Sequence, residues 1–180
     1  MKIRPQTHPQ LSKLGEIVAP IEVAMLTTRS ADDVLTSRPM TPLEMDESGT
    51  FWFFTTRDSD ALDGRGPVGL VFVDPAKAIY VAVAGEAALV EDRDRIRALW
   101  TPMARPWFPD GPDSPDLVLL AVRAMHADTW EGPHSKVLRL LAMAASVAAA
   151  RPIGLGDHDR VDPAGDASDT GPLGPFPAVT

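Results

Sequence analysis

The stretch "VGLVFVDPAKAIYVAVAGEAALVE", Val68 to Glu91, consists of two runs of β-branched and aromatic residues joined by a short turn. The first run is typical of a strand that ends at Pro75, and the second is typical of a longer strand. Gly85 interrupts the second run, and we expect a bend or a bulge there. No helical pattern separates the two runs, which argues against a doubly wound parallel sheet.

Strand-like runs also dominate the rest of the chain. Turn residues separate them, as in "RSADD" and "MDESGT". Four more strands are predicted, at residues 21–28, 33–45, 51–56 and 117–131. Six mostly adjacent strands predict a mainly β (α+β) fold, built on a small six-stranded antiparallel barrel.

Helices are expected beside this barrel. Apolar residues recur at helical spacing in residues 9–18 and again in residues 92–100. The clearest helix covers residues 135–151, with Ser135 as its N-cap. Residues 59–62 have the pattern of a further, short helix.

Length and composition predict one compact domain, residues 1–161, followed by a Pro/Gly/Asp-rich tail, residues 162–180. The net charge of −8 disfavours binding to nucleic acid or to an anionic membrane. The chain has no cysteine, which excludes disulfides, thiolate metal sites and cysteine nucleophiles. Because no apolar segment resembles a signal peptide or a membrane span, we expect a cytoplasmic protein.

The chemical inventory offers few catalytic patterns. The four histidines match no metal-ligand spacing, and we expect no metal site. The acidic cluster "GDHD", residues 156–159, is interpreted as a solvated loop in the polar stretch that begins at Gly154. The sequence contains no nucleophile elbow and no phosphate loop. No catalytic residue is therefore assigned.

An arginine within a strand, Arg38 of "SRPM", is the most informative polar residue. It either pairs with Glu44 or Asp46 or faces an anionic ligand, since a guanidinium offers a fork of donors suited to phosphate. Hydroxyl groups at the end of another strand, those of Thr55 and Thr56, are suited to the same kind of ligand.

Several motifs, taken in order, resemble the general stress protein 26 family. They include "SRPM", "GTFWFFTTRDS", "WFPDGPDSPDLVLL" and "TWEGPHSKV", and the resemblance extends from about Leu11 to Val161. That family belongs to the pyridoxamine 5'-phosphate oxidase-like split barrels, which bind flavin. The resemblance implies a six-stranded split β-barrel with Greek-key connections and flanking helices. It also implies a homodimer with FMN at the interface, while FAD or a deazaflavin remains open.

The resemblance also implies which residues hold the flavin. They are Arg38, Pro39, Met40, Thr55, Thr56, Ser59 and Trp130. Trp130 is expected near the flavin ring, either of its own chain or of the partner across the interface, and Ser59 near the phosphate. Any redox chemistry would come from the flavin, and the small-molecule substrate is not named by the sequence.

One departure from the family concerns the phosphate. Relatives usually carry a lysine two residues after the serine, whereas this chain continues with Asp60 and Ala61. Losing a charge-assisted contact weakens affinity by roughly ten- to hundredfold, unless Arg57 or Arg65 takes its place. Three functions therefore remain open, namely a flavin-dependent oxidoreductase, a non-enzymatic flavin binder, and a structural stress-response dimer that has lost its flavin.

Overall fold

One sheet of nine strands organises the computed structural model, which describes residues 1–59, 67–132 and 157–161. The strands are β1 (Lys2–Ile3), β2 (Ala24–Arg29), β3 (Leu35–Met40), β4 (Glu44–Met45), β5 (Thr50–Thr56), β6 (Pro67–Asp74), β7 (Ile79–Val90), β8 (Leu117–Glu131) and β9 (Asp157–Val161). The helices are α1 (Pro9–Val18) and α2 (Arg93–Leu99), with single 3-10 turns at Pro102–Ala104 and Gly111–Asp113.

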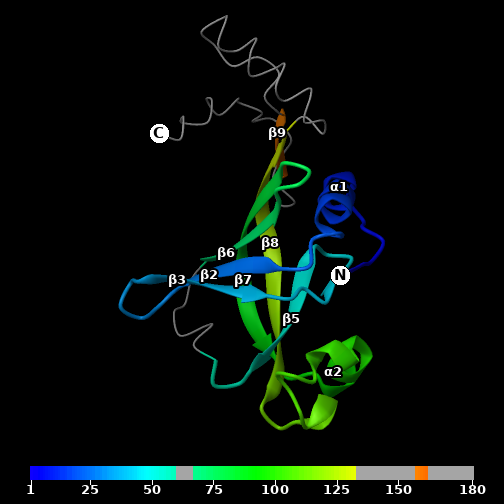
Figure 1. Cartoon of the computed structure of the whole chain (residues 1–180), viewed down its shortest axis with the longest axis vertical. Coiled ribbons are helices and arrows are strands. Elements are labelled where there is room, and N and C mark those ends of the chain that lie inside the picture. The colour runs from blue at the N-terminus through cyan, green and yellow to red at the C-terminus, as the bar shows by residue number, and fades with distance from the viewer. Residues whose placement is uncertain (60–66, 133–156, 162–180) are drawn as a thin grey trace, which may run out of the picture.

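The order of the strands leaves the sheet open. Neighbours follow the path β1-β4-β5-β8-β7-β6-β2-β3, and β9 pairs with the second half of β8. All pairs are antiparallel except β1 with β4. Among the described strands no pairing joins β3 to β1, so the sheet curls without closing. The long strand β8 runs along the molecule, with β9 near one end and α2 near the other (Figure 1).

The two strands predicted in the opening stretch form the β6–β7 hairpin. Asp74 pairs with Ile79 across the turn, and the pairing continues to Pro67 and Glu86. The expected irregularity at Gly85 is confirmed, because the β7–β8 register shifts between Ala84 and Gly85. A Cβ atom at Gly85 would lie 2.5 Å from the carbonyl oxygen of Arg123, so glycine is required where the two backbones approach.

Alternation of side chains divides the sheet into an inward and an outward face. Inward residues such as Leu26, Phe51, Phe53 and Leu70 are fully buried and join α1 in the main core. A smaller core lies on the outward side of β5 and β8, where Ile96 of α2 packs with aromatic residues.

Helix α1 begins and ends where its sequence predicts, and α2 lies within the predicted residues 92–100. Helix α1 starts after His8, whose ring accepts a hydrogen bond from the backbone N–H of Gln10. Helix α2 starts after Asp92, whose carboxylate accepts one from the backbone N–H of Arg95. The predicted helices at 59–62 and 135–151, apart from Ser59 itself, lie outside the described residues, as does the tail at 162–180.

The mainly β architecture is confirmed, with two differences in detail. The strand predicted at 33–45 is divided into β3 and β4, and the two-residue strand β1 adds a pair that sequence patterns do not reveal. The interpretation of "GDHD" as a solvated loop is wrong, because its last three residues begin strand β9. Pairing with β8 satisfies the backbone of this charged segment, and Val161 anchors it in the core.

Candidate functional site

Strand β3 carries Arg38 on the inward face of the sheet. Arg38 pairs with Leu26 of β2, which is fully buried, and directly opposed residues project to the same face. Pro39 pairs with the exposed Met25 and therefore faces outward. Met40 faces inward again and packs against the main core. Of these three predicted site residues, Arg38 is the one whose polar group lies at the open edge of the sheet.

The turn after β5 brings a second predicted residue to Arg38. The backbone N–H of Ser59 donates to the carbonyl oxygen of Thr56 at 3.1 Å, which closes the turn. Arg38 Nη1 then donates to Ser59 Oγ at 3.4 Å. Thr55 is buried on the inward face of β5, and Thr56 is exposed at its end. We refer to Arg38, Thr55, Thr56 and Ser59 as the strand-end cluster.

The carboxylates that might have paired with Arg38 are occupied elsewhere. Glu44 is buried and accepts hydrogen bonds from Arg4 Nε at 3.0 Å and from Arg95 Nη2 at 3.2 Å. The Asp46 carboxylate accepts from Trp52 Nε1 at 2.8 Å. Among the described residues, no carboxylate contacts Arg38. Its guanidinium is therefore available for an anionic or hydrogen-bond-accepting ligand.

Asp46, Trp52 and Arg95 belong to one network of contacts. Burial alone would raise the pKa of Asp46, but hydrogen bonds from Ser48, Trp52 and the backbone N–H of Thr50 outweigh it and lower the pKa. The guanidinium of Arg95 also stacks over the Trp52 ring, 3.8 Å from its centroid. This network joins α2 to the β4–β5 hairpin and has a structural role.

Arg57, which could replace the lysine that relatives usually carry after the serine, pairs with another residue. Arg57 directs both terminal nitrogens to the carboxylate of Glu91, with Nη2 at 3.0 Å from Oε2 and a shorter contact from Nη1 to Oε1. Hydrogen bonding to Glu91 and its negative charge raise the pKa of Arg57. Arg65 lies outside the described residues.

Trp130 lies far from the strand-end cluster within one chain. Thr55 pairs with Val118 near the start of β8, whereas Trp130 pairs with Tyr80 twelve residues further along the strand. That separation corresponds to about 40 Å of strand length. Trp130 shares the outward face of the sheet with Tyr80. A single chain thus brings Arg38 to Ser59 but does not bring Trp130 to either.

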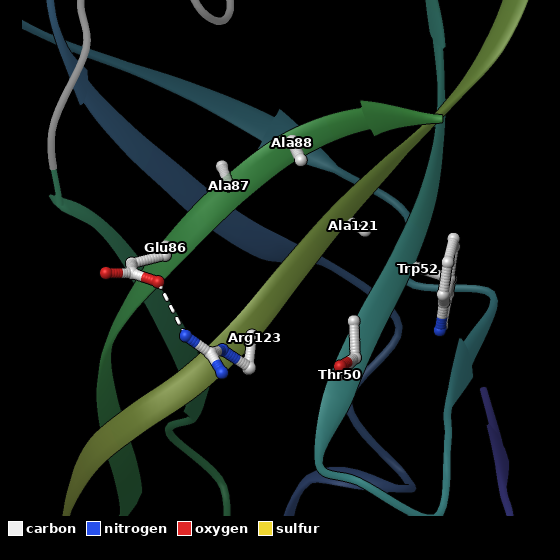
Figure 2. A pocket seen from close by; sticks show the side chains of 7 residues that line it. All are labelled: Thr50, Trp52, Glu86, Ala87, Ala88, Ala121 and Arg123. Carbon is white, nitrogen blue, oxygen red and sulfur yellow. Dashed lines mark hydrogen bonds and ion pairs between the residues drawn. The ribbon is translucent and has the colours of Figure 1, made fainter. Parts of the chain in front are cut away.

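A surface pocket lies on the outward face of β5, β8 and β7 (Figure 2), and none of the predicted site residues lines it. Its volume is about 320 Å³, and its lining comprises Thr50, Trp52, Glu86, Ala87, Ala88, Ala121 and Arg123. Alanines form its middle, Trp52 stands at one side, and the ion pair between Arg123 Nη2 and Glu86 Oε2 at 2.7 Å closes the other. We place the candidate site at the strand-end cluster, since the polar groups that line the pocket already have partners: Arg123 bonds to Glu86, Trp52 to Asp46 and Thr50 to Ser48.

Comparison with known proteins places the chain in a family. The family model described as "Pyridoxamine 5'-phosphate oxidase like" matches residues 9–152. Protein bli-3 of Neurospora crassa is 25% identical over 131 residues, which cover 66% of this chain. The chain spans 63% of the length of that curated relative.

Solved structures of similar proteins share the fold. A general stress FMN/FAD binding protein from Xanthomonas citri is 27% identical with a TM-score of 0.60, and the match covers 70% of this chain and 91% of that one. A protein related to general stress protein 26, from Clostridium acetobutylicum, is 24% identical with a TM-score of 0.59, covering 67% and 87%. The open, curled sheet is thus the split barrel of these proteins, and the chain belongs to the pyridoxamine 5'-phosphate oxidase-like family.

Proposed function

We propose that this protein binds a flavin, with FMN as the first candidate, at the strand-end cluster. The observation that carries the proposal is the position of Arg38, an inward-facing guanidinium at the open edge of the barrel that touches Ser59 and no described carboxylate. A cation placed in this way fits a ligand with carbonyl and phosphate oxygens. The flavin named for the relative from Xanthomonas citri has both kinds of group.

The residues of the cluster have distinct parts in this proposal. Arg38 donates to the flavin, and the hydroxyl groups of Thr56 and Ser59 supply hydrogen bonds to its phosphate end. Thr55, which is buried beside them, supports the strand end. When bound, a flavin supplies electron transfer. The chain's own contribution is to position the ring and to shield it from water.

We also propose that two copies of the chain assemble so that Trp130 of one chain completes the site of the other. Support comes from the outward face of the sheet, where Met25, Val71, Val73 and Tyr80 are exposed side by side on β2, β6 and β7. Such a patch is typical of a protein interface. Trp130 pairs with Tyr80 on the same face, so an interface here would carry it to a second chain.

We further propose that the protein is an oxidoreductase. The alternative is a flavin carrier without catalytic activity. The purified protein is expected to carry or take up flavin, visible by absorbance. Anaerobic addition of NADH or NADPH then separates the two, because bleaching of the flavin bands indicates an oxidoreductase and unchanged bands indicate a carrier. A protein that takes up no flavin would contradict both.

The structure adds one finding on localisation. Within the described ranges, no helix is long and apolar enough to cross a membrane. We propose a cytoplasmic protein, as the composition predicts.

A further inference from the structure

The ion pair between Arg57 and Glu91 lies at the edge of the proposed flavin site. Arg57 follows Thr56 directly and precedes Ser59 by two residues, so its backbone belongs to the turn that presents the cluster. In sequence, the segment from Thr55 to Ala61 contains one cation, Arg57, against Asp58 and Asp60. The segment has a net charge of −1 with this guanidinium and of −2 without it, so Arg57 is its one group that can offset the charge of a phosphate.

We propose that Glu91 limits the affinity of the site for phosphate by holding Arg57 away from it. This inference rests on the proposed function. It assigns Glu91 a role in discriminating between phosphorylated and unphosphorylated flavins, and Glu91 acts as a positioning residue through Arg57.

The sheet topology keeps the side chain of Arg57 apart from that of Arg38. Thr56 pairs with Leu117 of β8, and Glu91 follows the end of β7, the strand on the other side of β8. The Arg57 side chain thus extends across the start of β8 to reach Glu91. Ser59 Oγ instead meets Arg38 on β3, which lies at the far end of the sheet path. Arg57 is thus directed toward the end of β7, and Arg38 toward the turn after β5.

Because the ion pair between Arg57 and Glu91 is exposed, it restrains Arg57 only weakly. The side chains of Arg57 and Glu91 are 45% and 55% exposed, and exposed ion pairs are weak because water and salt screen them. A flavin phosphate accepts two parallel hydrogen bonds from a guanidinium, as the carboxylate of Glu91 does. Glu91 therefore competes with the phosphate for Arg57, and its negative charge also repels the phosphate. Neither effect reaches the uncharged flavin ring.

The test compares FMN with riboflavin, which lacks the phosphate, in equilibrium titrations of the full chain. Glu91→Gln is expected to tighten FMN by about three- to tenfold, and to leave riboflavin unchanged. Adding Arg57→Ala to this variant is expected to remove most of the gain and to leave only the part that comes from the lost repulsion between Glu91 and the phosphate. Glu86→Gln is the matched control, since it removes the same charge from an exposed ion pair on β7, the strand that Glu91 follows. That variant should leave the ratio of the two affinities as it is.

Each other outcome contradicts the inference. An unchanged ratio of FMN to riboflavin affinity in Glu91→Gln would show that Glu91 does not restrain Arg57. A strong loss of FMN binding in Arg57→Ala alone, with riboflavin unaffected, would show that Arg57 already holds the phosphate. If riboflavin binds and Glu91→Gln leaves the ratio of FMN to riboflavin affinity unchanged, the flavin site is supported and the role of Glu91 is wrong. If neither ligand binds, the proposed function falls and this inference falls with it.

Discussion

Arg38 Nη1 donates a hydrogen bond to Ser59 Oγ at 3.4 Å, although β3 and β5 are not neighbours in the sheet. The contact spans the open edge of the barrel, where the curl of the sheet brings its distant strands together. The guanidinium of Arg38 and the hydroxyl group of Ser59 meet there. This relationship locates the candidate site more sharply than any motif of the sequence.

The outward face of the sheet predicts assembly into a dimer. Sedimentation at micromolar concentration is expected to give twice the chain mass of 19.3 kDa. Val71→Asp should shift the protein toward the monomer, because it places a charge in the exposed apolar patch. Val34→Asp, in the exposed turn between β2 and β3, is the control and should remain dimeric. A monomeric wild type would contradict the proposed assembly.

The close approach at Gly85 predicts a large effect of a single methyl group. Gly85→Ala is expected to lower the free energy of unfolding by about 1–3 kcal/mol, because the new Cβ must displace backbone rather than a flexible side chain. Gly69→Ala on the neighbouring β6 is the control. The heavy atom nearest to the Cβ added at Gly69 is the Cβ of Thr27, at 3.8 Å, so stability should change little. Urea denaturation of both variants makes the comparison, and equal stabilities would rule out the strained approach.

The hydrogen bonds to Asp46 predict a pH dependence of stability. The pKa of Asp46 is lowered in the folded protein from its ordinary value of 3.8. The stability that this carboxylate contributes is therefore present above that value and is lost as the pH falls through the lower, folded pKa. Asp46→Asn should reduce the loss of unfolding free energy below pH 3.8. The exposed Asp32→Asn variant should behave like the wild type, and identical acid unfolding of all three proteins would refute the effect.

Strand β9 predicts where the chain can be shortened. Truncation after Asp162 keeps β9 and is expected to leave the melting temperature nearly unchanged. Truncation after Gly156 removes β9 and the buried Val161, and should lower the melting temperature by about 5–10 °C. Scanning calorimetry distinguishes the two. A large drop already in the longer variant would mean that residues beyond 162 take part in the fold.

Local patterns in the sequence predicted much of the fold. The bounds of α1 and β8 agree with the prediction, because helical spacing and a long apolar run are strong local signals. Strand β9 was missed since "DHDRV" is mostly charged, and its pairing with β8 rather than its own propensity makes it a strand.

The candidate site was predictable only in part. Arg38 and Ser59 were both named, but their contact depends on the curl of the whole sheet. The pairing of Arg57 with Glu91 joins residues 34 positions apart and leaves no local signal. The same holds for Glu44, whose partners Arg4 and Arg95 come from the two ends of the domain's first hundred residues.

Titration of the purified protein with riboflavin and with FMN, for wild type and Arg38→Ala, tests the central claim most directly. The wild type is expected to bind both flavins with dissociation constants below about 100 μM, and Arg38→Ala to weaken both by about tenfold or more. Arg29→Ala on the adjacent β2, which pairs with the exposed Asp33, is the control and should bind like the wild type. Failure of the wild type to bind either flavin, or equal binding by Arg38→Ala, would contradict a flavin site at the strand-end cluster.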